Sequence, residues 1–426
     1  MRCRPLIVIL VSLAAGSLSF AQSNPDVTQQ VGTPEATPAP SPPPADNSSL
    51  AQYHYTLALL RLSSGSSPSE RLVMVTELRK AIQLRPDFVE AHALLGEILL
   101  QSGDTDGALD EFRLAARLRP GNPQTHLALA NALIAKHDWK AAGAELKEAL
   151  RLDPSLAQAH YNLGGIQYTT GHPQQAIHSY QEALRLQPDF ADAHYRLGLV
   201  LKLAGREKES VGELRKAAEG GVARAQYFLG NAYRSGQGIE RNLPMAIHWW
   251  MRAFEQGLDE ADIALSQLRR AALSGGSRAN KQAVIVREGF EVYCRLQWQD
   301  YPDLDASAED ETLGTTLLKV GPADRALPAL LREGYALSEQ AHVRLEALYV
   351  EGGGEGLDPY DSRILQYLLI TAGDGFQHSR ATLALVYGKG LGVNRDLGKS
   401  KEFLRGLPEA DAKRVREELA SETTGS

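Results

Sequence analysis

The amino-acid sequence predicts an all-α fold, a right-handed superhelical solenoid of helix-turn-helix repeats. Of its 426 residues, 43% are hydrophobic but only 7% aromatic. A core rich in Ala and Leu and poor in aromatic residues favours close-packed helices over strands. Prolines recur every 34 residues from Pro86 to Pro188. A fixed period of this size indicates repeated supersecondary units that stack on one another.

The first 21 residues have the pattern of a cleaved secretory signal peptide. Arg2 and Arg4 form a short basic region, and the uncharged segment 6–18 follows; Ser19 and Ala21 are small residues at the positions that a signal peptidase reads. An uncleaved membrane anchor is the alternative, but the apolar segment is shorter than the ~20 residues that span a bilayer. We therefore predict a periplasmic or secreted protein with no integral membrane segment after signal cleavage.

Residues 22–49 are predicted to form a proline-rich, disordered linker. They hold seven of the 21 prolines, set among Ala, Ser and Thr. Such a segment cannot bury a core and favours an extended chain. It would let the folded part of the protein stand away from its N-terminus.

Charge and cysteine content narrow the possible partners. The formal net charge is −7, which argues against nucleic acid or an anionic membrane surface as the main ligand. Only Cys294 remains once residues 1–21 are removed, so no intramolecular disulfide can form. We expect Cys294 to pack as a small hydrophobic residue; an intermolecular disulfide or a reactive thiol is the alternative.

The period also predicts where helices end and how they pack. Each proline of the series stops a second helix and turns the chain into the next unit. Small residues on the first helices leave room for larger residues on the second helices. The small residues are Gly96, Ala130, Gly164 and Gly198, and the larger ones are Phe112, Leu146, Tyr180 and Leu214.

These positions resemble the tetratricopeptide repeat, and the resemblance covers residues 50–221. In that family the first helix of each unit lines a concave groove, along which ligand peptides lie. Amides can bond an extended peptide backbone, and tyrosine supplies apolar area with a polar end. The resemblance therefore implies a partner-binding groove formed by Gln124, Leu127, Asn131, Gln158, Tyr161, Asn162, Tyr168, Tyr195, Arg196 and Lys202.

A second pattern begins after the last of these units. The segment 225–230 is followed by a glycine-bearing loop and then by Trp249 and Trp250. This pattern resembles a Sel1-like repeat, which we place at 222–257. Weaker copies indicate further Sel1-like repeats over 338–407.

The remaining segments fit neither repeat. Residues 258–337 are predicted to be a degenerate helical region that continues the stack, and residues 408–426 a capping helix with a tail. Within the degenerate region, the expected helices are 258–273, 281–297, 312–319 and 323–337.

The sequence offers no motif for catalysis, and we predict no cofactor and no metal site. Gly236 and Gly238 superficially suggest a phosphate loop, but helices are expected on both sides of them instead of a strand and a helix. The alternating acids that begin at Asp303 lack the glycine and the final glutamate of a calcium loop.

Four histidines recur at one repeat position. Equivalent positions on stacked hairpins lie roughly 10 Å apart, too far for one metal ion with ligand bonds of ~2 Å. We expect a packing role in the core or at its boundary for His92, His126, His160 and His194.

These observations predict a non-enzymatic protein-interaction scaffold that holds an extended segment of a partner protein. A scaffold component of envelope or exopolysaccharide export machinery is the alternative of the same class. An enzyme with an unrecognised site in 258–337 is a further alternative. A closed pocket with clustered carboxylates or histidines of perturbed pKa would favour the enzyme, and an open Tyr- and Asn-lined groove would favour the scaffold.

Overall fold

The computed structural model describes residues 46–64, 67–274, 281–304, 312–352 and 357–421. The predicted signal peptide and residues 22–45 of the predicted linker lie outside the described residues. Among the helices within these ranges, none has the length and apolar character needed to cross a membrane.

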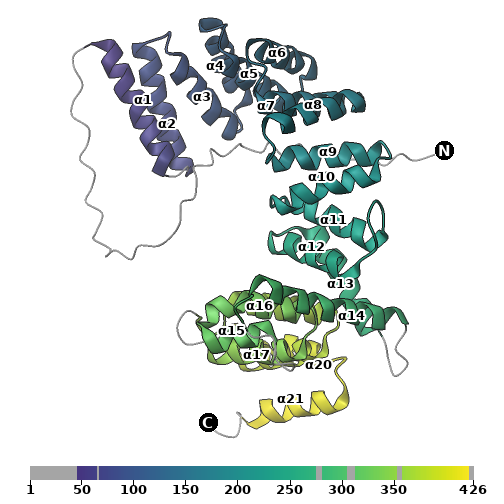
Figure 1. The fold of residues 1–426 in the computed structure, drawn as a ribbon. Coiled ribbons are helices and arrows are strands. Elements are labelled where there is room, and N and C mark those ends of the chain that lie inside the picture. The colour runs from purple at the N-terminus through teal and green to yellow at the C-terminus, as the bar shows by residue number, and fades with distance from the viewer. Residues whose placement is uncertain (1–45, 65–66, 275–280, 305–311, 353–356, 422–426) are drawn as a thin grey trace, which may run out of the picture. The chain divides into compact units, whose positions relative to one another are not determined.

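The chain divides into two compact units, Met1–Pro188 and Asp189–Ser426, which we call the N-terminal and C-terminal units. The division falls inside the segment 50–221, for which the sequence predicts one repeat array. Both units are helical throughout their described regular elements, as the sequence predicts (Figure 1).

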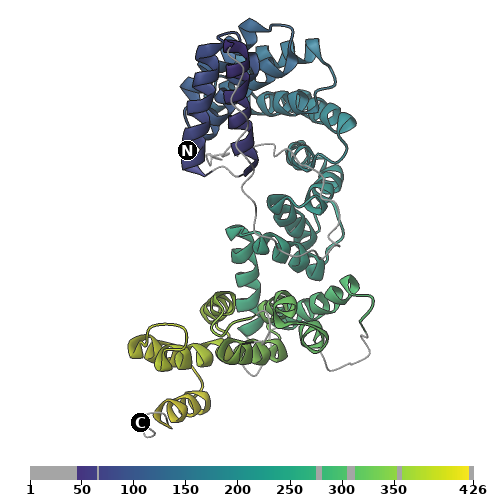
Figure 2. The same cartoon turned by 90° about the vertical axis from the view of Figure 1, so that its left-hand side faces the viewer.

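The N-terminal unit consists of four helical hairpins that stack in chain order (Figures 1 and 2). Its first helix begins three residues before the predicted array, where Asp46 Oδ1 accepts a hydrogen bond from the backbone N–H of Ser49. The helices are α1 (Asn47–Ser64), α2 (Pro68–Leu84), α3 (Val89–Gln101), α4 (Thr105–Leu118), α5 (Pro123–Ala135), α6 (Trp139–Leu152), α7 (Ala157–Thr169) and α8 (Pro173–Leu186).

The ends of these helices follow from the repeated sequence. The second helix of every hairpin ends at the leucine of a Leu-x-Pro segment, two residues before the proline, as predicted. Second helices α4 and α6 begin after an aspartate, and the carboxylates of Asp104 and Asp138 each accept a backbone N–H at 3.0 Å. An aspartate in this position satisfies a backbone donor that the helix itself leaves unpaired.

The small residues of the first helices accept aromatic rings of the second helices, as the period predicts. A Cβ atom added at Gly96 would lie 2.7 Å from the ring of Phe112, and one at Gly164 would lie 2.9 Å from Tyr180. Both rings are buried. Only glycine therefore lets the ring lie against the helix backbone at these two positions.

We expect Gly96→Ala to destabilise the N-terminal unit by about 1–2 kcal/mol, because the added methyl group must displace the Phe112 ring. Thermal or urea unfolding followed by hydrogen exchange in α3 and α4 would measure this. Gly143→Ala is the matched control, since an added Cβ meets nothing within 4 Å there. The control should be neutral or slightly stabilising because alanine favours the helix. Equal losses in both variants would contradict the packing argument.

The histidine series has a role that the sequence analysis did not predict. His92 is buried, with its Nδ1 2.5 Å from Glu111 Oε2 and its Nε2 2.9 Å from the carbonyl oxygen of Pro86. His126 makes the same two contacts, at 2.7 Å and 3.0 Å. Each ring therefore joins its own second helix to the turn that precedes its hairpin, a hydrogen-bonding role beyond simple packing.

One member of the series is different. His160 keeps the contact with the preceding turn, 3.1 Å from the carbonyl oxygen of Pro154. Ser179 stands 19 residues after it, where Glu111 and Glu145 stand in the two hairpins before. The Ser179 hydroxyl instead donates to Oε1 of Gln167 at 2.8 Å. The α7–α8 hairpin thus departs from the polar contacts of its neighbours.

The C-terminal unit contains thirteen α-helices and one 3₁₀-helix, η1, within its described residues (Figures 1 and 2). Its elements are α9 (Ala191–Leu203), α10 (Glu207–Glu219), α11 (Ala223–Ser235), α12 (Leu243–Glu255), α13 (Asp259–Leu273), α14 (Lys281–Leu296), η1 (Gln297–Asp300), α15 (Leu313–Val320), α16 (Ala323–Tyr335), α17 (Glu339–Glu351), α18 (Ser362–Gly373), α19 (Gln377–Lys389), α20 (Leu397–Leu404) and α21 (Glu409–Ser421).

The glycine-bearing loops end their helices in the left-handed conformation. Gly236 after α11 has φ of 79°, and Gly390 after α19 has φ of 80°. This region favours glycine because it has no Cβ. Trp250 is fully buried, and a Cβ added at Gly230 would lie 2.6 Å from its ring. These glycines therefore serve turns and close helix packing, with helices on both sides of the loop, as expected.

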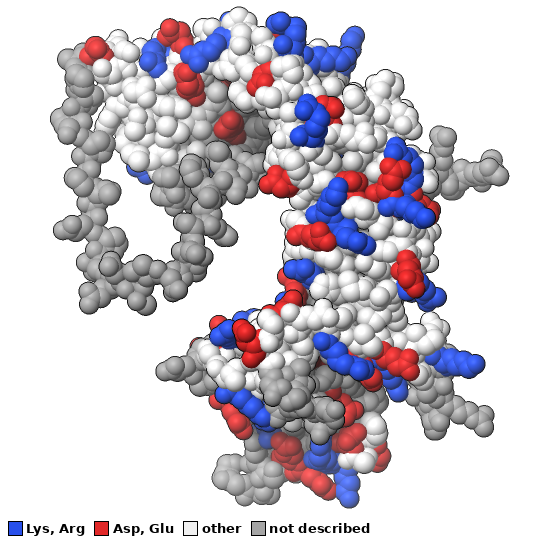
Figure 3. Space-filling model, in the orientation of Figure 1, with Lys and Arg blue, Asp and Glu red and all other residues white. Residues whose placement is uncertain are grey.

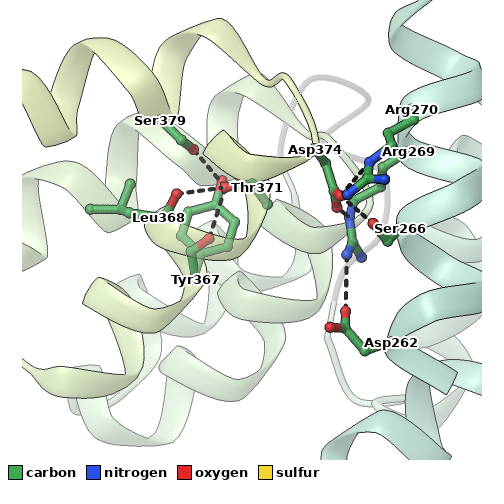
Figure 4. Close-up of polar contacts among 9 residues, drawn as sticks. All are labelled: Asp262, Ser266, Arg269, Arg270, Tyr367, Leu368, Thr371, Asp374 and Ser379. Carbon is green, nitrogen blue, oxygen red and sulfur yellow. Dashed lines mark hydrogen bonds and ion pairs between the residues drawn. The ribbon is translucent and has the colours of Figure 1, made fainter. Parts of the chain in front are cut away.

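A buried ion network joins α13 to the end of α18 (Figure 4). The Arg269 side chain is fully buried and donates to Asp374, whose carboxylate is also almost fully buried. Ser266 and Arg270 donate to the same carboxylate, and Arg269 also pairs with Asp262 at 3.2 Å. These contacts connect segments that lie more than 100 residues apart in the sequence.

Candidate functional site

The predicted groove residues of the N-terminal unit lie on α5 and α7. Gln124, Leu127 and Asn131 line a pocket of about 240 Å³ between α3 and α5. Gln124 is exposed at its rim, while Leu127 is only 8% exposed and forms part of its floor. First helices of successive hairpins therefore do face a shared hollow.

Amide side chains connect α5 with α7 beside this pocket. Asn162 Nδ2 donates to Asn131 Oδ1 at 2.6 Å, and Gln158 Nε2 donates to Asn162 Oδ1 at 3.0 Å. All three side chains remain partly exposed. Because each amide has more donors and acceptors than these bonds use, hydrogen-bonding capacity remains for a bound chain.

The two predicted tyrosines of α7 lie in different turns of the helix. The Tyr161 ring packs 5.8 Å from the ring of Tyr180 on α8. Tyr168 lies in the last turn of α7 and is partly buried. Neither ring lines the pocket between α3 and α5.

Acidic residues that the sequence analysis did not select also line this pocket. Glu97 is exposed to solvent yet has no hydrogen-bond or ion-pair partner among the described residues. Desolvation by the surrounding helices raises its pKa. Glu90 pairs with Arg119 at 2.8 Å; burial acts to raise its pKa, but hydrogen bonds from its own backbone and from Arg119 bring it below the ordinary value.

A sequence signal for these acids does exist. Glu90 and Glu97 are seven residues apart on α3 and therefore lie on one face of that helix. They stand one 34-residue period before Gln124 and Asn131, which lie on the equivalent face of α5. The predicted set begins with Gln124 and takes no residue from the unit before it, so it omitted the equivalent positions on α3.

The remaining predicted residues belong to the C-terminal unit. Tyr195 is buried on α9, with its ring 6.3 Å from that of Phe228 on α11. The Arg196 guanidinium lies 5.8 Å from the Tyr195 ring, and Lys202 Nζ lies 5.5 Å from the Phe228 ring. The ten residues thus fall into two groups, one in each unit.

Two pockets of the C-terminal unit lie in and around the segment 258–337. One, of about 460 Å³, lies between α12, α13, α16 and α18; the other, of about 320 Å³, lies between α12, α14, η1 and α16. Both are lined by Glu255 and Arg332, which form an ion pair. In the second pocket, burial and nearby Arg252 lower the pKa of His248.

Titratable groups of this segment have structural explanations. Burial raises the pKa of Glu333 to about 7, but its carboxylate accepts the backbone N–H of Gly314 at 3.2 Å and so caps α15. Burial raises the pKa of the Cys294 thiol to about 12, which suits the packing role expected of it. No group of His, Cys, Asp and Glu that could hold a metal ion occurs among the described residues.

Acidic and basic side chains are interspersed on the face of each unit that Figure 3 shows. This agrees with many close ion pairs, such as Arg151 with Glu148 and Arg206 with Glu209. On that face no large area carries a single sign of charge.

Family models match several parts of the chain. A model described as TPR repeat matches residues 130–171 and 174–205, and one described as Tetratricopeptide repeat matches 75–123. A model described as Sel1 repeat matches 223–258 and 381–405. No curated protein matches the chain significantly.

Solved structures with a similar arrangement of helices are distant in sequence. MamA from Desulfovibrio magneticus is 21% identical with a TM-score of 0.36, covering 40% of this chain and 93% of its own. PilF of Pseudomonas aeruginosa is 19% identical with a TM-score of 0.43, covering 48% and 91%. A protective antigen of uropathogenic Escherichia coli with an SLR fold is 15% identical with a TM-score of 0.41, covering 87% and 88%.

Proposed function

The chain carries tetratricopeptide repeats and Sel1 repeats, and from this premise we propose that it is an exported protein-interaction scaffold. Its N-terminal unit would hold an extended segment of a partner protein along α3, α5 and α7. The observation that carries the proposal is the pocket between α3 and α5, with the amides that continue from it onto α7.

The side chains along these helices suit a peptide backbone. Gln124, Asn131, Gln158 and Asn162 offer both donors and acceptors, and an extended chain presents backbone N–H and C=O groups that need such partners. The floor formed by Leu127 and neighbouring alanines supplies apolar contact for a partner side chain. The proposed site thus combines backbone pairing with a shallow apolar pocket.

The charge of the pocket suggests what the partner segment carries. Within the described part of the chain Glu97 has no ion-pair partner, whereas Glu90 pairs with Arg119. A Lys or Arg side chain of the partner would pair with Glu97 and offset the cost of its partial desolvation. We propose that the bound segment contains a basic residue opposite Glu97.

A crosslinking pull-down with the full protein as bait, from envelope fractions and from culture medium, tests this proposal. Asn131→Ala with Asn162→Ala should abolish capture of a dominant partner, because the pair supplies the amides that bridge α5 and α7. Replacing both ends of their mutual hydrogen bond leaves neither end unpaired, and Gln158, which loses its acceptor on Asn162, is partly exposed to water, so folding should be retained. Unfolding curves of both proteins would verify that.

The control removes two amides elsewhere in the N-terminal unit. Gln174→Ala with Gln181→Ala changes exposed residues of α8, outside the pocket, and should leave capture unchanged. Glu97→Lys should also weaken capture, because it places a cation opposite the basic residue proposed for the partner. A partner retained by the amide variant, or no partner in either fraction, would overturn the proposal.

Export is part of the proposal because residues 1–21 have the sequence pattern of a secretory signal peptide. A scaffold of envelope or exopolysaccharide export machinery is the narrower version of the same function. The pull-down separates the two by the identity of the captured protein.

A further inference from the structure

A second hollow of the N-terminal unit lies between α6 and α7, which are neighbours in the stack (Figure 1). Its volume is about 760 Å³. Trp139, Leu163, Ile166 and Gln167 form much of its lining, and Lys140 and Lys147 stand on the same side as Trp139. It is lined by α6, the second helix of a hairpin, whereas the pocket between α3 and α5 is lined by first helices.

The preceding interface, between α4 and α5, explains why this hollow exists. The two interfaces are related by the 34-residue period, so their positions can be compared one to one. Leu109 and Leu133 are buried in the first interface. The equivalent positions in the second are Gly143 and Gln167. A Cβ added at Gly143 would meet nothing within 4 Å, so the position that Leu109 fills in the first interface is open here.

The same comparison shows that two acids are absent. In the first interface Asp106 pairs with Lys136 at 2.7 Å, and Asp110 pairs with Arg113 at 3.5 Å. The positions equivalent to Asp106 and Asp110 hold Lys140 and Ala144.

The hollow therefore carries cations without counterions. Lys147 stands where Arg113 stands in the first interface. Lys140 and Lys147 have no ion-pair partner among the described residues. Asp138, the one acid in the lining, is engaged in capping α6.

We propose that this hollow is a docking site for an acidic segment of a partner protein. The segment would place an aliphatic side chain in the open space at Gly143, beside Gln167, and carboxylates opposite Lys140 and Lys147. In the first interface, Leu109 supplies the aliphatic side chain, and Asp106 and Asp110 supply the carboxylates. The surface goes beyond the proposed groove, because it shares no lining residue with the pocket between α3 and α5.

The hollow combines lysines with an apolar floor. This combination favours a protein segment with carboxylates and an aliphatic side chain over a simple anion. Screened lysines on a surface attract any polyanion, but only a ligand with an apolar side chain gains from filling the floor of Trp139, Leu163 and Ile166. The test therefore separates these two parts of the ligand.

The probe is the blocked pentapeptide Asp-Gly-Ala-Leu-Asp, the sequence of residues 106–110, added to the full protein and followed by ligand-observed NMR. We expect binding that is lost with Lys-Gly-Ala-Leu-Lys and weakened about tenfold or more when alanine replaces the leucine. A disaccharide of uronic acids serves as the anion without an aliphatic side chain. Binding of the disaccharide but not of the peptide would overturn the proposal.

Gly143→Leu is the decisive variant, because it fills the hollow from within as Leu109 fills the first interface. It should abolish binding of the pentapeptide while keeping or raising the unfolding temperature, so loss of binding cannot be ascribed to misfolding. Lys140→Ala with Lys147→Ala should also abolish binding. Arg113→Ala, the equivalent change at the filled interface, should not affect it.

The variant of the proposed groove separates the two sites. Asn131→Ala with Asn162→Ala should bind the pentapeptide as the unchanged protein does. Absence of binding to the unchanged protein, or binding that survives Gly143→Leu, would overturn the docking site without touching the groove.

Discussion

Replacing Asp374 by alanine is expected to destabilise the C-terminal unit by about 3–5 kcal/mol, the usual cost of removing one partner from a buried ion pair. The Arg269 guanidinium is fully buried, and Asp374 is its closest acid (Figure 4). Without that carboxylate, the acid that Arg269 still contacts among the described residues is Asp262, at 3.2 Å. Ser266 also loses its acceptor. The loss is large because a buried guanidinium that loses its carboxylate is not solvated by water in its place.

Hydrogen exchange in α13 and α18 would report the effect, together with the rate at which Cys294 reacts with a thiol reagent. Cys294 is partly buried, and this burial raises its pKa to about 12, so opening of the unit should increase its rate of reaction. Asp324→Ala is the control, since Asp324 pairs with Arg363 at 3.2 Å on the surface. Exposed pairs contribute little. Similar effects of both variants would contradict the role given to burial.

The second large effect is a loss of stability of the N-terminal unit above neutral pH. Burial lowers the pKa of His92, but the hydrogen bond to Glu111, that to the Pro86 carbonyl and the Glu111 charge together bring it above its ordinary value. Burial likewise acts to lower the pKa of His126, but the hydrogen bonds to Glu145 and to the Pro120 carbonyl, with nearby negative charge, raise it above its ordinary value. Both ring nitrogens face acceptors, and only the protonated imidazole can donate from both.

The sign follows from linkage between protonation and folding. A histidine with a raised pKa in the folded state stabilises fully below its unfolded value of about 6.5, and this stabilisation is lost as pH rises through the folded pKa. For the two sites together we expect a loss of about 2–3 kcal/mol. Urea unfolding between pH 6 and pH 9, with hydrogen exchange in α3 to α6, would measure it.

His92→Gln with His126→Gln should flatten this pH dependence. His160→Gln should not, because His160 lacks the carboxylate of the other members. A pH profile unchanged by the double histidine variant would contradict the assignment.

At acid pH a different group contributes. Glu77 has a lowered pKa: burial acts to raise it, but hydrogen bonds from Lys80 and His54 outweigh burial. The stabilisation by Glu77 is present above about pH 4.5 and disappears as the pH falls through the lower folded pKa.

The helical hairpins could be predicted because the period fixes their ends and their packing. Gly96 and Phe112, or Gly164 and Tyr180, are matched by local spacing alone, and the structure confirms both contacts. The expected helices of 258–337 also agree closely with α13 to α16. Hydrophobic periodicity was sufficient there, even without a repeat to follow.

The polar contacts were harder to predict. Glu111 and Glu145 recur in register 19 residues after His92 and His126, so a signal existed, but charged residues on a second helix are usually taken as solvent-facing. The bond between Arg269 and Asp374 links segments 105 residues apart, with no period to relate them. Local pattern cannot reveal such a partner.

The candidate site was predicted only in part. Asn131 and Asn162 do meet across α5 and α7, because equivalent faces of first helices are adjacent in a stack. Tyr195 is buried against Phe228 and so serves packing within the C-terminal unit. A sequence pattern shows which face of a helix a residue occupies, but not how deeply its neighbours cover it.

The reach of the histidine contacts also bears on how such a protein can change in length during evolution. His92 contacts a carbonyl six residues before it and a carboxylate 19 residues after it, so the whole set fits within one 34-residue copy. Duplication or deletion of a complete copy in the gene would preserve every member of the set. The bond between Arg269 and Asp374 spans 105 residues, so the same genetic event inside α13 to α18 would separate partners that have no replacement. Growth by repeat duplication is therefore open to the N-terminal unit and closed to this part of the C-terminal unit.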